Sequence, residues 1–196
     1  MRAMAQSEFP TLPDLLRGGL DVVFVGINPS LFSVAQGHYF ARKTNRFWPA
    51  FSRSRLSLAV RQTLGVERLE PMHDRVLPDH GFGFTDLVKR ASPRATDLAR
   101  NEPMEGVAAL ARKIKRHKPR FACLHGVTVG RPVQRALAPE LGDIGLGLQP
   151  YRIGATHVFV VPNPSPANAH FTPADQTAWY DRLADWLAAL AAESRR

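Results

Sequence analysis

Four short apolar segments constrain the fold of this chain more than any other feature. Each ends in a turn or at polar residues, and they are residues 20–25, 81–88, 121–126 and 156–161. Segments with helical periodicity separate them, and this alternation is typical of parallel strands joined by crossover helices. We therefore predict an α/β protein: a three-layer α/β/α sandwich with a short, mainly parallel, four-stranded sheet that is covered on both faces.

The segments between these strands carry helix signals. We expect a helix to start near residues 44–45, another to end near residue 138, and the last to begin with Thr172 as its cap and Pro173 in its first turn. Apolar stripes predict which side chains face the core: Phe47, Trp48 and Phe51 in one helix, Met104, Val107, Ala111 and Ile114 in a second, and Trp179, Leu183, Trp186, Leu187 and Leu190 in the last.

The composition limits the class of protein. The 196 residues suit one domain, which we place at residues 20–196 after an N-terminal arm, residues 1–19, expected to be loose or a short helix. The single cysteine, Cys123, excludes a disulfide framework, a four-cysteine zinc site and a four-cysteine iron–sulfur cluster within this chain. No apolar run approaches the roughly 20 residues of a membrane helix, and no secretory signal is evident. We expect a soluble, intracellular protein.

The charge indicates a partner without naming the chemistry. The chain has 26 Lys and Arg against 17 Asp and Glu, a formal net charge of +9, which favours polyanions and first of all nucleic acid. Ligands of parallel α/β sheets bind beyond the carboxyl ends of the strands. The polar loops expected at that edge are Gly26–Ser30, Asp86 and Asn163–Ser165.

Three motifs in these loops resemble a known family. Gly26-Ile27-Asn28-Pro29-Ser30 is followed by Phe40 and Asn45-Arg46-Phe47-Trp48, and much later by Asn163-Pro164-Ser165. In this order they resemble the mismatch-specific uracil-DNA glycosylase and thymine-DNA glycosylase family of the uracil-DNA glycosylase superfamily, from about residue 20 to residue 190. The resemblance implies the uracil-DNA glycosylase fold and hydrolysis of the bond between a flipped uracil and its deoxyribose, in G·U mismatches, other uracil contexts and some damaged pyrimidines.

The resemblance also implies roles for individual residues. Asn28 would orient the attacking water, and Phe40 would stack on the base. The backbone N–H groups of Ile27 and Phe40 would contact uracil, and Ser33 falls on a family serine close to the substrate. Ser30 replaces the glycine usual in the nearest relatives, so we expect weak removal of thymine.

A loop implied to enter the DNA differs from that of the nearest relatives. Its residues are Asn163, Pro164, Ser165, Pro166, Ala167 and Asn168. The bacterial mismatch-specific enzymes typically place a leucine wedge after this Asn-Pro-Ser, whereas this chain has Pro166-Ala167, which is more similar to the loop of single-strand-selective glycosylases. We therefore expect duplex invasion to depend on other side chains or on weakened base pairs.

Asp86 is the second departure from the family pattern. It stands in Gly83-Phe84-Thr85-Asp86-Leu87-Val88, where relatives have Asn or Lys. A carboxylate there is suited to accept a proton from water or to stabilise a cationic sugar, so we hypothesise that Asp86 is catalytic. The alternative is that Asp86 caps a helix at the exit of the strand.

We expect a monofunctional hydrolase, because no lysine stands at the motif positions to form a Schiff base. We expect neither a cofactor nor a metal, because no ligand cluster implies one. We expect a cytoplasmic, nucleoid-associated, bacterial-type monomer that acts on uracil-containing DNA, double-stranded and also single-stranded, and not at a membrane. Candidate phosphate contacts are Arg42, Lys43, Arg46, Lys89 and Arg90. The alternative from another class is a non-catalytic DNA- or nucleotide-binding protein on the same fold.

Overall fold

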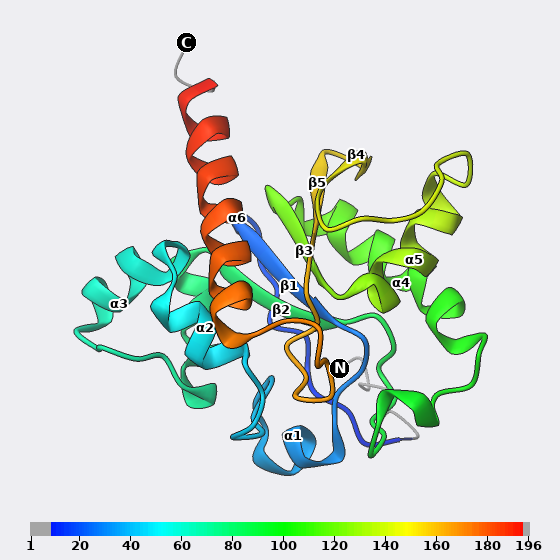
Figure 1. The fold of residues 1–196 in the computed structure, drawn as a ribbon, viewed down its shortest axis with the longest axis horizontal. Coiled ribbons are helices and arrows are strands. Elements are labelled where there is room, and N and C mark those ends of the chain that lie inside the picture. Colours follow the sequence, from blue (N-terminus) through cyan, green and yellow to red (C-terminus); the bar gives the residue numbers. More distant parts are fainter. Residues whose placement is uncertain (1–8, 194–196) are drawn as a thin grey trace, which may run out of the picture.

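The computed structural model describes residues 9–193, which form a twisted sheet between two layers of helices (Figure 1). The strand order is β2-β1-β3-β5-β4. The strands are β1 (Val22–Gly26), β2 (Phe82–Asp86), β3 (Phe121–His125), β4 (Gly147–Ile153) and β5 (Thr156–Val161). Strands β1, β2, β3 and β5 run parallel to one another, which confirms the predicted three-layer, mainly parallel architecture.

The sheet has five strands in the described part of the chain, so the prediction of four was wrong. The additional strand, β4, pairs antiparallel with β5 at the edge of the sheet. It contains Pro150, and its register with β5 is irregular between Leu148 and Arg152. Proline is tolerated in an edge strand because it lacks only a donor that would face away from the sheet, but it removes the sequence signal of a strand.

Helices cover both faces of the sheet. The α-helices are α1 (Leu31–Gln36), α2 (Phe47–Arg53), α3 (Leu58–Leu64), α4 (Glu102–His117), α5 (Val127–Leu137) and α6 (Pro173–Glu193). Four short 3₁₀ helices join them: η1 (Arg55–Ser57), η2 (Pro71–Arg75), η3 (Leu77–His80) and η4 (Ala95–Asp97). No helix between residues 9 and 193 is long and apolar enough to cross a membrane.

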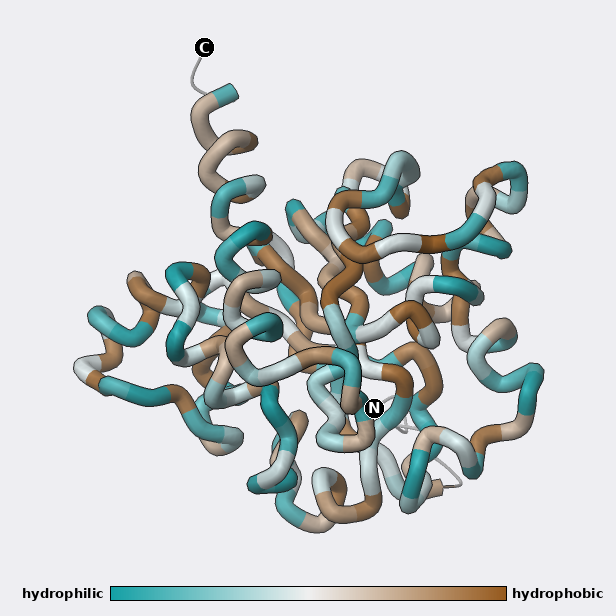
Figure 2. Tube along the Cα trace, viewed as in Figure 1, coloured by the Kyte–Doolittle hydropathy of each residue, from teal (hydrophilic) through white to brown (hydrophobic). Residues whose placement is uncertain are grey.

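Alternate side chains of β1 enter two separate cores. Phe24 packs on one face among aromatic residues of α2 and α6, including Phe47 at 5.0 Å and Tyr180 at 6.1 Å between ring centroids. Val23 and Val25 enter the second core with residues of α4 and α5. Figure 2 shows this arrangement as brown, hydrophobic colour along the central strands. β1 is apolar at every position because both of its faces are covered.

Two side chains of the predicted apolar stripes do not face the core. Met104 in the first turn of α4 is 42% exposed and Trp186 of α6 is 43% exposed. Trp186 lies to one side of the buried stripe of α6, in which Leu183 is fully buried and Leu187 and Leu190 pack against the core. Figure 1 shows the C-terminal half of this helix projecting beyond the sheet. The predicted cap of α6 is confirmed, because Thr172 Oγ1 accepts from the Asp175 backbone N–H at 3.1 Å.

Residues 9–19 run along the sheet without forming a helix, and they are not loose. Leu12 is 2% exposed, and Leu15 exchanges two backbone hydrogen bonds with Phe84 of β2, at 2.9 and 3.0 Å. Residues 1–8 of the expected N-terminal arm lie outside the described residues. The segment therefore covers the free edge of β2.

The two sides of α6 should differ in their contribution to stability. We expect Leu183→Ala to lower the free energy of unfolding by about 2–5 kcal/mol, because it leaves a cavity in the core. Trp186→Ala should cost less than Leu183→Ala, because Trp186 is 43% exposed and its removal leaves no enclosed cavity. Urea denaturation of both variants checks this, and equal losses would contradict the helix orientation.

Candidate active site

A cavity of about 690 Å³ lies beyond the carboxyl ends of β1, β2, β3 and β5. Every residue that the sequence predicted for the site lines it: Ile27, Asn28, Ser30, Ser33, Phe40, Asp86, Asn163, Pro164, Ser165, Pro166, Ala167 and Asn168. The parallel topology explains this, because four strand ends meet at one edge of the sheet.

The Asn28 side chain is held in one orientation. Its Nδ2 donates to the Arg90 carbonyl at 3.0 Å, to Ser92 Oγ at 2.8 Å and more weakly to the Pro29 carbonyl at 3.3 Å. Carbonyl oxygens only accept hydrogen bonds, so the amide nitrogen must face them. Asn28 Oδ1 is then the atom left to accept a hydrogen bond from a water in the cavity.

Phe40 forms an aromatic wall of the cavity in an unusual backbone conformation. Its φ is +52°, in the left-handed region that non-glycine residues rarely adopt. Its ring stacks on Phe47 with a centroid distance of 4.5 Å and lies 5.1 Å from the ring of His125. A strained backbone conformation of this kind persists only where the surrounding structure holds it, and such residues are often found at functional sites.

The two serines after β1 hold the loop that carries Phe40. Ser30 caps α1, because its Oγ accepts from the Ser33 backbone N–H at 3.1 Å. Ser33 is buried, and its Oγ accepts from the Ala41 backbone N–H at 3.2 Å. Ser33 therefore fixes the chain next to Phe40.

Asp86 is a buried carboxylic acid at the end of β2. It is 3% exposed, it lines the cavity, and its Oδ2 has no hydrogen-bond partner. Burial raises the pKa of Asp86 from its ordinary 3.8 to about 7; Lys89 and Lys113 oppose this increase and Asp14 adds to it. The carboxyl therefore exchanges a proton near neutral pH, as a general base requires.

Asp86 caps no helix, so that alternative for its role was wrong. The next helical segment after β2 is η4, and its N-cap is Arg94. Asp14 of the N-terminal segment binds the polar groups next to Asp86. It accepts hydrogen bonds from Thr85 Oγ1 at 2.7 Å and Lys89 Nζ at 2.8 Å, and it pairs with Lys113 Nζ at 2.6 Å.

The β5–α6 loop, residues 162–172, is folded by its own side chains. Asn163 Oδ1 accepts from the Ser165 N–H at 2.9 Å, and Ser165 Oγ accepts from the Ala167 N–H at 3.3 Å. Asn168 Nδ2 closes the turn onto the Asn163 carbonyl at 3.0 Å. The residues predicted to enter DNA thus form a compact turn of small side chains.

Most of the candidate phosphate contacts bind protein groups instead. Lys89 pairs with Asp14, and Arg90 donates to both carboxylate oxygens of Glu102 at 2.8 and 2.7 Å. Arg46 donates to backbone carbonyls of the β5–α6 loop. This leaves Arg42 and Lys43, two exposed residues near the cavity mouth, as the cations best placed for phosphates.

The lining residues that the sequence analysis missed include His125 and Ser92. His125, 2% exposed, receives the Tyr180 hydroxyl hydrogen at Nε2 (2.9 Å), since its Nδ1 faces the Val25 carbonyl (3.3 Å). Burial lowers the pKa of His125 to about 3, so it stays neutral. Because His125 ends β3, its place at the carboxyl edge of the sheet could have been predicted from the sequence. Ser92 carried no signal, because its contact with Asn28 depends on tertiary structure.

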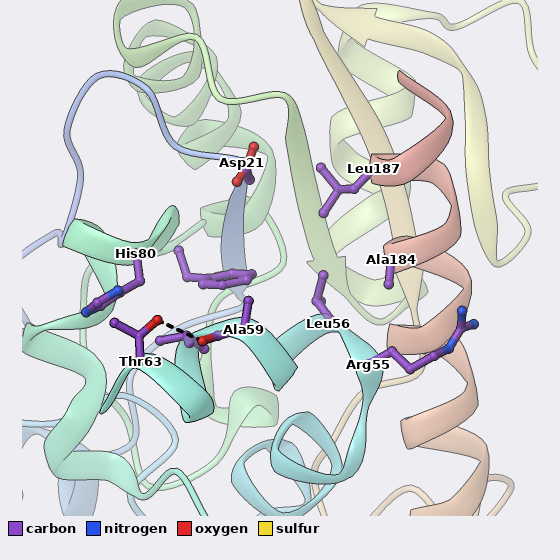
Figure 3. Close-up of a pocket in the computed structure, with 10 residues that line it drawn as sticks. Asp21, Arg55, Leu56, Ala59, Thr63, His80, Ala184 and Leu187 are labelled. Carbon is purple, nitrogen blue, oxygen red and sulfur yellow. Dashed lines mark hydrogen bonds between the residues drawn. The ribbon is translucent and has the colours of Figure 1, made fainter. Parts of the chain in front are cut away.

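A second hollow of about 310 Å³ lies at the opposite ends of β1 and β2, beside Asp21 and Phe82 (Figure 3). It is lined mainly by apolar side chains of α3 and α6, and it contains none of the predicted site residues. Across residues 9–193, no group of three His, Cys, Asp or Glu side chains is suited to hold a metal ion.

The fold and the cavity define an α/β protein with a ligand site at the carboxyl edge of its sheet. A family model described as the uracil DNA glycosylase superfamily matches residues 13–187. The chain is also 30% identical over 152 residues to a G/U mismatch-specific uracil DNA glycosylase of Schizosaccharomyces pombe. The chain belongs to the uracil DNA glycosylase superfamily, which confirms the resemblance seen in its motifs. The match covers 76% of this chain and 45% of the yeast protein, so the chain spans less than half of that relative's length.

Replacing the buried acid should change stability in a pH-dependent way. The native pKa of Asp86, about 7, exceeds the ordinary 3.8, so its contribution to stability is present at acid pH and lost as the pH rises through 7. We expect the stability of Asp86→Asn relative to the natural protein to increase by about 3 kcal/mol between pH 5 and pH 8. Denaturant titrations at the two pH values measure it, and a pH-independent difference would contradict the raised pKa.

Proposed function

We propose that this protein is a monofunctional DNA-repair glycosylase that hydrolyses the N-glycosidic bond of uracil in DNA and leaves an abasic site. The observation that carries the proposal is the convergence of Asn28, Asp86 and Phe40 on one cavity at the carboxyl edge of the sheet. An aromatic wall suits a flipped base, while an amide oxygen and a base of pKa about 7 suit the activation of water.

The geometry supports a hydrolytic mechanism. The bond from deoxyribose C1′ to uracil N1 breaks, its electron pair leaves with the base, and the sugar acquires oxocarbenium character. Asn28 Oδ1 orients a water toward C1′, and the Asp86 carboxylate takes a proton as the new C1′–O bond forms. The uracil anion is then protonated from solvent and Asp86 releases its proton to solvent, which completes the addition of one water.

The surroundings of the cavity favour hydrolysis over Schiff-base chemistry. Among the described residues, no lysine lines the cavity, and Lys89 is held by Asp14. An amine that attacks the sugar is therefore not in place. The mismatch specificity of the yeast relative, as its name states it, supports G·U mismatches as a substrate.

The compact β5–α6 loop supports action on further uracil contexts, including single-stranded DNA, and on some damaged pyrimidines. The Ser30 side chain lines the cavity, which supports weak removal of thymine. We further propose that the protein acts as a monomer in a bacterial-type cytoplasm, associated with the nucleoid, where its net charge of +9 favours DNA.

Loss of the Asp86 carboxylate should remove most of the activity. We expect Asp86→Asn to lower single-turnover uracil release by roughly 100- to 10,000-fold, because the amide cannot accept the proton. Asp143→Asn, which changes an exposed carboxylate, is the matched control and should retain the natural rate. Gel detection of alkali-cleaved abasic sites in U·G, U·A and single-stranded oligonucleotides measures both. An unchanged rate for Asp86→Asn refutes its catalytic role, and binding without release by the natural protein would favour the non-catalytic alternative.

The pH dependence should report the same group. Below pH 7 we expect kcat/KM to rise about tenfold per pH unit and then to level off, because only the ionised carboxylate acts as a base. Asp86→Asn should abolish this inflection. A natural profile that is flat between pH 5 and pH 8 would show that Asp86 does not act as the base.

A further inference from the structure

Arg46, in the Asn45-Arg46-Phe47-Trp48 motif, is bound to the β5–α6 loop and not to solvent. Its Nη1 donates to the Asn168 carbonyl at 2.9 Å and to the Phe171 carbonyl at 2.5 Å. Its backbone N–H donates to the Pro164 carbonyl at 2.9 Å. One residue at the start of α2 therefore holds this loop near its beginning, near its tip and near its end.

Two features make this contact more than a surface hydrogen bond. Arg46 is half-buried, and 122 and 125 residues separate it from the two carbonyls that its guanidinium binds. The turns within the loop, from Asn163 to Asn168, fix its shape, but nothing in those turns fixes its position relative to the cavity. Arg46 supplies that connection, next to Phe47, on which Phe40 stacks.

The small side chains of the loop make its position important. A leucine-sized wedge gains contact area when it inserts into DNA, whereas Pro166 and Ala167 offer little. A loop of this kind helps most when it is ordered beforehand, since ordering a flexible segment on binding reduces affinity. The Arg46 guanidinium, which the sequence analysis considered as a phosphate contact, binds the loop carbonyls and so orders the loop.

We propose that Arg46 is a positioning residue that preforms the β5–α6 loop for insertion into duplex DNA. The inference rests on the proposed glycosylase function. The loop is needed to occupy the space left by a base flipped out of a duplex, and that space does not exist in a single strand. Loss of Arg46 therefore impairs duplex substrates more than single-stranded ones.

The experiment compares Arg46→Met with Arg53→Met. Methionine keeps much of the apolar stem but has no donors, and Arg53 is an exposed arginine of the same helix, α2, so both variants lose one charge. Single-turnover uracil release is measured on a U·G duplex and on the same uracil strand alone. We expect Arg46→Met to lower the duplex-to-single-strand rate ratio about tenfold and Arg53→Met to leave the ratio unchanged. An equal loss on both substrates overturns the proposal.

Arg46→Lys separates geometry from charge. An ammonium keeps the charge, but the Nζ of lysine lies one bond short of the Nη1 that donates to both carbonyls, so the ratio should stay well below that of the natural protein. Full recovery by lysine would overturn the assignment to paired carbonyl contacts. The salt dependence of DNA binding gives a further test. If Arg46→Met reduces the slope of log K against log salt concentration by about one on both substrates, Arg46 contacts a phosphate, and the proposed positioning role is overturned.

Amide hydrogen exchange of the DNA-free protein tests the same inference without activity. Arg46→Met should accelerate exchange in residues 163–171, while the strands exchange as in the natural protein, which shows that the variant is folded. Unchanged exchange in the loop overturns the proposal whatever the rates are. If the natural protein releases no uracil from either substrate, the proposed function fails, and the exchange result still decides whether Arg46 orders the loop.

Discussion

The in-register pairing of β1 with β2 is the constraint on which the site depends. It places Gly26 opposite Asp86, so closely that a Cβ at Gly26 would lie 2.5 Å from Asp86 Oδ1. Only glycine leaves room for the carboxyl at this point. Because Asn28 follows Gly26 by two residues, the same pairing sets the positions of the amide and the acid relative to each other. The first strand and its turn therefore carry both the core of the sheet and the geometry of the chemistry.

The buried acid also explains the structure around β2. A carboxyl without a partner at Oδ2 is costly to keep inside a protein, and the cost falls when cations are near. Lys89 and Lys113 supply positive charge, and Asp14 holds both of them from the N-terminal segment. The segment before the first strand is thus part of the electrostatic environment of the site, although it contributes little to the sheet itself.

Much of this architecture was predictable because local signals agreed with the tertiary structure. Continuous apolar runs predicted the four parallel strands, and the residues expected at their carboxyl ends, including Asp86, do line one cavity. The features that were missed depend on partners far away in sequence. β4 was hidden by Pro150, which only an edge position tolerates, and Ser92 acts through its contact with Asn28. Trp186 follows the apolar period of α6, but the core is contacted by Leu183, Leu187 and Leu190, and the period alone does not show where the buried stripe ends.

The extended segment at residues 9–19 and the proline in β4 have one consequence in common. Leu15 occupies the outer hydrogen-bonding groups of β2 at Phe84, while Pro150 and the irregular register interrupt β4 at the opposite margin. Exposed strand margins are templates on which further chains add and aggregate. Within residues 9–193, both margins of the sheet are thus obstructed, so its backbone presents no continuous open edge to which a strand of another chain could add.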